Sequence, residues 1–200
     1  MNTTIYFVRH GEVSNPKEVW YGRLPGYGLS EKGKAQIAQT AAFLAGQHID
    51  VVYTSPLLRA RQTAKIISEK LHLPAHTSKE LLEVQSSLQG TPFATVKTFD
   101  YDIFAALGKA IVGETIEEVA SRQRNFINKM FRLYPEKRIV AVSHGDPIML
   151  VSAISKQLPI KNISLRPGAD AYMKHGEVYR VENIEGKQLR CTSIFTPSSL

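Results

Sequence analysis

The chain has 200 residues, 43% of them hydrophobic, and this predicts one globular domain (residues 1–200) with a sizeable core. Its formal net charge is +7, but the lysines and arginines are scattered and no nucleic-acid-binding motif occurs, so the charge favours attraction of small anionic substrates over nucleic acid binding. One cysteine excludes an intrachain disulfide, and no apolar run predicts a membrane span or signal sequence, so we expect a cytoplasmic protein.

Short apolar runs alternate with helix-like segments along most of the chain, which is typical of βαβ units. Thr115 and Glu118 have the spacing of a capping box at the start of the longest helix. We therefore expect an α/β three-layer sandwich: a mainly parallel sheet, helices on both faces and an antiparallel edge strand formed near the C-terminus. In chain order, the predicted elements are strand 3–9, helix 30–46, strand 50–54, helix 56–72, edge strand 74–77, a short helix near 100–111, helix 115–134, strand 138–143, helix 147–157, and strands 171–173, 177–182 and 188–194.

Three polar motifs directly follow predicted strands. They are Arg9–Glu12 (RHGE), Ser55–Arg59 (SPLLR) and Ser143–Pro147 (SHGDP). Ligands bind at the carboxyl edge of the sheet in open α/β folds, so we expect the two histidines and two arginines of these motifs to lie together. Ser55 and Asp146 are expected to cap the helices that follow them.

These residue types suit phosphoryl transfer. A guanidinium matches phosphate oxygens in paired hydrogen bonds, so Arg9 and Arg59 are candidate phosphate ligands. A neutral imidazole is a competent nucleophile near neutral pH. The residues alone do not distinguish His10 from His144 in that role.

Together the motifs resemble the histidine phosphatase superfamily, which includes cofactor-dependent phosphoglycerate mutases and many phosphatases. Arg9–Glu12 resembles its opening signature, Ser55–Ala64 its second motif and Ser143–Gly145 its late histidine. The resemblance extends over nearly the whole chain. It implies catalysis through a phosphohistidine on His10, with His144 as a donor that stabilises the transferred group and Gly145 in the phosphate site.

The general acid is expected in the segment 79–90, which resembles the family stretch that supplies it. Glu83 is the best match, although its interval to Gly90 is one residue shorter than in the mutases. Glu114 is the reserve candidate. The alternative is that Glu80 and Glu83 form an ordinary solvated pair.

The loop after the first motif supplies further candidates for phosphate binding. Asn15 resembles a family asparagine but comes one position early and precedes a proline, so it is alternatively a turn residue. Gly22 and Arg23 resemble the pocket-lining segment, and Arg23 is equally well explained as a surface arginine. Phe93 and three later aromatic residues form either an apolar wall over the pocket or, as we expect, the packed face of a small helix.

No metal or cofactor is expected. Cys191 is the only cysteine, and no convincing ligand spacing is found at four further histidines, which we expect on the surface or in loops. These are His48, His72, His76 and His175.

The leading interpretation is a metal-independent phosphomonoester phosphatase acting on a phosphorylated small molecule through a phosphohistidine on His10. The alternatives are a cofactor-dependent phosphoglycerate mutase and a catalytically silent module that binds phosphorylated ligands. A short variable insert at about 84–114 argues against the mutase, because it leaves phosphohistidine open to water. The complete set of catalytic candidates argues against the silent module.

Overall fold

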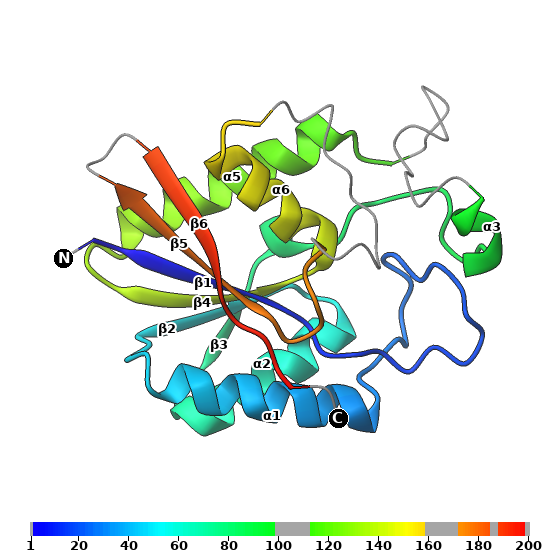
Figure 1. Cartoon of the computed structure of the whole chain (residues 1–200), viewed down its shortest axis with the longest axis horizontal. Coiled ribbons are helices and arrows are strands. Elements are labelled where there is room, and N and C mark those ends of the chain that lie inside the picture. Colours follow the sequence, from blue (N-terminus) through cyan, green and yellow to red (C-terminus); the bar gives the residue numbers. More distant parts are fainter. Residues whose placement is uncertain (1, 99–112, 159–171, 185–187, 199–200) are drawn as a thin grey trace.

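A computed structural model describes residues 2–98, 113–158, 172–184 and 188–198, and Figure 1 shows their arrangement. Six strands form one sheet in the order β3-β2-β4-β1-β5-β6. The strands are β1 (Thr4–Arg9), β2 (Val51–Thr54), β3 (Ala75–Thr77), β4 (Arg138–Ser143), β5 (Val178–Ile184) and β6 (Gln188–Phe195). The helices are α1 (Glu31–Ala45), α2 (Leu58–Leu71), the 3-10 helix η1 (Lys79–Leu81), α3 (Phe93–Lys97), α5 (Ile116–Leu133) and α6 (Gly145–Ser155).

The sheet is parallel on one side and antiparallel on the other. β4 pairs in parallel with both β1 and β2, and β2 pairs in parallel with β3. β5 runs antiparallel to β1 and to β6, so the antiparallel edge is a two-stranded hairpin. The predicted fold class is confirmed.

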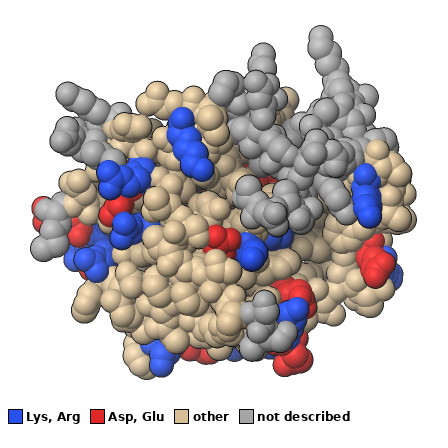
Figure 2. Space-filling model, viewed as in Figure 1, with Lys and Arg blue, Asp and Glu red and all other residues tan. Residues whose placement is uncertain are grey.

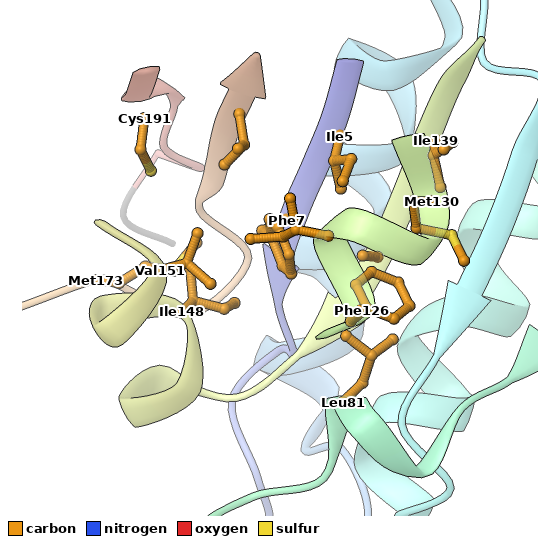
Figure 3. Packing of buried hydrophobic residues seen from close by; sticks show 13 residues of the cluster. Ile5, Phe7, Leu81, Phe126, Met130, Ile139, Ile148, Val151, Met173 and Cys191 are labelled. Carbon is orange, nitrogen blue, oxygen red and sulfur yellow. The ribbon is translucent and has the colours of Figure 1, made fainter. Parts of the chain in front are cut away.

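Alternation along β1 places two hydrophobic cores on opposite faces of the sheet. Ile5 and Phe7 belong to the cluster that α5 and α6 cover. Figure 3 shows Phe7 in this cluster, with Phe126 and Met130 of α5 and with Ile148 and Val151 of α6. Tyr6 and Val8 point to the other face, where α1 and α2 pack. The molecule therefore has three layers, as Figure 1 shows.

Two helices begin as their sequences predict. Ser30 caps α1 through its hydroxyl, which accepts a hydrogen bond from the Gly33 N–H at 2.9 Å. Thr115 and Glu118 form both hydrogen bonds of the capping box at the start of α5. These caps satisfy N–H groups that have no partner within the first turn.

Other local predictions are wrong or lie outside the described residues. The predicted strand at 171–173 does not form at Tyr172 and Met173, because the Met173 carbonyl accepts a hydrogen bond from the Arg9 side chain instead of a neighbouring strand. Residue 171 and the predicted helix near 100–111 lie outside the described residues. The helix found in the insert is α3, at Phe93–Lys97.

Charged side chains are spread over the molecule. In the face that Figure 2 shows, lysines and arginines lie scattered among acidic residues and do not form one continuous basic surface. In the described part of the chain, no helix is both long and apolar enough to cross a membrane.

Candidate active site

The three sequence motifs meet at the carboxyl ends of β1, β2 and β4. Arg9 pairs with Ser143 in the β1–β4 register, and Thr54 pairs with Val142 in the β2–β4 register, so the three strands end level. Beyond the strands, the His10 N–H donates to the Ser143 carbonyl at 3.1 Å. The rings of His10 and His144 consequently lie 5.2 Å apart between centroids. The expected meeting of the motifs is confirmed.

His10 is held as a neutral imidazole with its Nε2 unprotonated. Its Nδ1 lies 2.8 Å from the Gly11 carbonyl oxygen, so Nδ1 carries the proton and donates it. Its Nε2 then accepts a hydrogen bond from Arg59 Nε at 3.1 Å. Burial, followed by the positive charge of Arg59, lowers the pKa of His10 well below its usual value. The lone pair on Nε2 is therefore available near neutral pH.

Arg59 is the second residue of α2, and its side chain is fully buried. Its Nη2 donates to the Gly22 carbonyl at 2.8 Å, and its guanidinium lies 4.8 Å from the centre of the Tyr21 ring. Arg9 is held in a similar way, over the Tyr172 ring at 5.1 Å. Neither arginine forms an ion pair with any described carboxylate. Arg9 and Arg59 thus place two positive charges near His10, and neither is paired with a described carboxylate.

The predicted cap of α2 is wrong, and the reason lies in this site. The helix begins at Leu58, and the residue at its N-cap position, Leu57, makes no side-chain capping bond. The Ser55 hydroxyl is instead 2.8 Å from His144 Nε2. Ser55 therefore orients a site histidine, and the Leu57 N–H, from which its hydroxyl accepts a hydrogen bond at 3.4 Å, lies in the turn before the helix.

The buried ring of His144 lies beside Glu83, whose side chain is partly buried. His144 Nδ1 has no hydrogen bond and lies 3.9 Å from Glu83 Oε2. The other carboxyl oxygen of Glu83 accepts from the Val84 N–H at 2.9 Å. Burial raises the pKa of Glu83 and lowers that of His144 well below its usual value. Glu83 is thus a partly buried carboxyl at the site and not half of a solvated pair with Glu80.

The structure places Arg23 and Glu114 behind the Glu83 segment. Glu114 forms ion pairs with both Arg23 and Arg122. The same two arginines donate to the Glu83 carbonyl, at 2.7 Å from Arg23 Nε and 3.2 Å from Arg122 Nη2. These contacts fix the backbone that carries Glu83. They do not bring Arg23 to the arginines at His10.

The three remaining predicted phosphate ligands differ in placement. Asn15 uses both ends of its amide on the Val19 backbone, which is the turn role of that residue. Gly22 lines the cleft, and its φ of 42° favours glycine. Gly145 begins α6, where a Cβ atom would lie 2.1 Å from the Tyr172 hydroxyl oxygen, so only glycine fits without a shift.

Asp146 does not cap α6, contrary to prediction. The helix begins at Gly145, and the Asp146 carboxyl accepts a hydrogen bond from the Tyr172 hydroxyl. Burial and the nearby Glu83 raise the pKa of Asp146 to about 7. The contact between Tyr172 and Asp146 could not be expected from the sequence, because the predicted strand at 171–173 would have placed Tyr172 in the sheet.

His175 is a site residue that sequence reasoning missed. It lies in a loop, as predicted, but its ring is 5.6 Å from that of His10. The neighbouring Gly176 N–H donates to the Arg9 carbonyl at 3.0 Å and so fixes the turn beside β1. The antiparallel pairing of β5 with β1 is the signal that places the start of β5 next to His10.

A cleft opens beside these groups. Its described lining comprises one arginine, two acids, a glycine and four aromatic residues: Arg9, Glu83, Asp146, Gly22, Trp20, Tyr21, Phe93 and Tyr172. Phe93 therefore belongs to the apolar wall that we considered less favoured, at the start of α3. The other three aromatic residues of that prediction, Phe99, Tyr101 and Phe104, lie outside the described residues.

Among the described residues, no group of three or more histidine, cysteine, aspartate or glutamate side chains is placed to hold a metal ion.

The comparisons agree with this geometry. The profile of the histidine phosphatase superfamily (branch 1) matches residues 5–183. The chain is 34% identical over 151 residues to the uncharacterized protein Rv0525 of Mycobacterium tuberculosis. The aligned region covers 73% of this chain and 75% of that protein. It is 31% identical over 151 residues to the uncharacterized phosphatase PhoE of Bacillus subtilis, covering 73% and 74% respectively.

Among solved structures, YhfR of Bacillus stearothermophilus superimposes with a TM-score of 0.82 at 21% identity over 98% of each chain, which shows the shared fold. The chain belongs to the histidine phosphatase superfamily, and the expectation of a phosphatase enzyme is confirmed at that level.

Proposed function

We propose that the chain is a metal-independent phosphomonoester phosphatase that forms a phosphohistidine on His10. The observation that carries the proposal is the environment of His10 Nε2: this unprotonated nitrogen accepts a hydrogen bond from Arg59 at 3.1 Å, and neither Arg59 nor Arg9 forms an ion pair with a carboxylate of the described residues. An anion that displaces the Arg59–His10 hydrogen bond would bring its phosphorus to this lone pair.

In the first step, the Nε2 lone pair attacks phosphorus and the bond from phosphorus to the ester oxygen breaks. Arg9 and Arg59 stabilise the charge on the three equatorial oxygens, and His144 contributes a hydrogen bond to them. Glu83, whose pKa is raised by burial, donates its proton to the departing alkoxide. The products of this step are the free alcohol and phosphohistidine.

In the second step, water attacks the phosphoryl group. The Glu83 carboxylate accepts the proton of the water, the bond from phosphorus to Nε2 breaks, and the lone pair returns to His10. Inorganic phosphate leaves, and the enzyme is restored. The position of Glu83, 3.9 Å from His144, supports its use in both steps better than the ion-paired Glu114.

Hydrolysis is favoured over mutase chemistry because the insert at about 84–114 is short and leaves phosphohistidine open to water. The similarity to a Bacillus subtilis protein named as a phosphatase supports the same choice. The substrate class we propose is a phosphorylated small molecule that fits the cleft beside Arg9.

The test is release of inorganic phosphate from an activated aryl phosphate, with excess chelator present. We expect turnover in chelator and none in His10→Ala. Turnover that chelator abolishes and a divalent ion restores would refute the metal-independent mechanism. Transfer of the phosphoryl group to an added sugar acid in place of water would identify a mutase, and binding of phosphate without turnover would identify a silent module.

A further inference from the structure

We infer that the cleft selects monoesters whose leaving group is aromatic or otherwise apolar and carries no second negative charge. The inference rests on the proposed function, because it concerns the part of the substrate that a phosphatase releases. Its basis is the composition of the described lining of the cleft, which holds one cation, two acids and four aromatic residues.

Trp20 and Phe93 form an aromatic platform on this wall. Their ring centroids are 6.0 Å apart in an edge-to-face arrangement. Backbone hydrogen bonds hold both loops together: the Trp20 N–H donates to the Thr91 carbonyl at 2.8 Å, and the Phe93 N–H donates to the Glu18 carbonyl at 2.8 Å. The platform is therefore built before a ligand arrives, which reduces the entropy that a ligand loses in ordering it.

The other two aromatic rings of the wall contact the guanidinium groups of the arginines. Arg59 lies over the ring of Tyr21 and Arg9 over that of Tyr172. Among the described aromatic residues of the cleft, the Trp20–Phe93 pair is therefore the surface that remains for a leaving group. Ligand sites of this kind bind apolar groups by burial and use few polar contacts to orient them.

The charges of the wall oppose a second anion. Apart from Arg9, no described lysine or arginine lines the cleft, whereas Glu83 and Asp146 both do. Arg23 and Arg122 lie nearby, but their guanidinium groups bind Glu114 and the Glu83 carbonyl. Above about pH 7 the Asp146 carboxyl is ionised, so a carboxylate on the leaving group would lose its hydration beside a like charge and find no further cation among the described lining residues.

The same reasoning separates this site from one for phosphorylated sugar acids. Arg9 and Arg59 supply the positive charge for one phosphoryl group. A substrate with an additional carboxylate or phosphate needs further cations in the cleft, and apart from Arg9 and Gly22 the described lining residues are aromatic or acidic. An uncharged aryl or alkyl leaving group can contact the aromatic and acidic residues of the cleft without the desolvation of a second charge.

The experiment compares kcat/KM at pH 8, where Asp146 is ionised, for phenyl phosphate and 3-carboxyphenyl phosphate, because their leaving phenols have similar acidity and differ in charge. We expect the wild-type protein to favour phenyl phosphate by about tenfold or more, and Asp146→Asn to reduce that preference at least about threefold. Asp50→Asn is the matched control, because Asp50 precedes β2 at the opposite end of the sheet and pairs with Lys137. It should keep the wild-type preference.

A second variant keeps the inference testable if Asp146→Asn fails to fold. Trp20→Leu should lower kcat/KM for phenyl phosphate about tenfold and change that for glycerol 3-phosphate far less. Equal kcat/KM for the two aryl phosphates in the wild-type protein, or a preference for the carboxylated one, would overturn the inference and leave the phosphatase intact. Turnover of neither would refute the proposed function and this inference with it.

Discussion

Replacement of Arg59 by lysine is the most informative single perturbation of the site, because it keeps the charge and removes the geometry. In the structure, Arg59 uses separate nitrogens for His10, at 3.1 Å, and for the Gly22 carbonyl, at 2.8 Å, and its planar face lies over Tyr21. A lysine ammonium is a compact point charge and cannot reproduce this fork. At least one hydrogen bond to the transferring phosphoryl group should be lost.

The loss of one such transition-state hydrogen bond costs about 2–4 kcal/mol, which corresponds to a decrease of roughly 30- to 1,000-fold in kcat/KM. The assay is hydrolysis of an aryl phosphate, with the Tm of each variant measured alongside, because Arg59 is fully buried. Arg61→Lys is the control, since Arg61 is exposed on the same helix. A folded Arg59→Lys protein within about twofold of wild type would show that Arg59 lies outside the reacting site.

Three further variants test separate parts of the site. Glu83→Gln should slow turnover most for substrates with poor alkoxide leaving groups and least for aryl phosphates, since only the former need the proton; equal losses on both would make Glu83 a structural residue. Asp146→Asn should stabilise the protein increasingly between pH 4 and pH 7, by at most about 4 kcal/mol. The sign follows because the folded-state pKa of Asp146, about 7, is raised above its ordinary value, so the native protein holds a proton that the unfolded chain releases, and stability falls as the pH rises. A Tm difference between variant and wild type that is the same at pH 4 and pH 8 would contradict this. His175→Ala should lower kcat about three- to tenfold with little change in KM, because the ring packs against His10 and not along the described lining of the cleft; an unchanged kcat would show that the contact is incidental.

Sequence patterns predicted the sheet and the meeting of its three motifs because both follow from local periodicity and chain direction. The continuous apolar run of β1 and the capping box at Thr115 and Glu118 can each be recognised within a few residues. The sequence also predicted that Ser55 and Asp146 lie at the starts of helices, but it did not predict which groups their side chains contact. Each side chain found a distant partner, His144 for Ser55 and Tyr172 for Asp146, that competed with helix capping.

His175 shows the limit more clearly. Nothing in its immediate neighbours distinguishes it from the other loop histidines, and its place beside His10 depends on the antiparallel pairing of β5 with β1. Arg23 shows the reverse case. Its segment resembled a pocket lining, yet its charge is used by Glu114. Long-range pairing of this kind is a property of the packed fold and not of sequence spacing.

Trapping of the phosphoenzyme tests the central claim most directly. Rapid denaturation without acid during turnover of a radiolabelled monoester, followed by mass spectrometry of the peptides, locates the phosphoryl group. We expect an acid-labile, base-stable adduct on His10, absent from His10→Ala and formed more slowly by His144→Ala. Phosphate found on His144 would reverse the two histidines, and turnover with no phosphohistidine on either would contradict the mechanism.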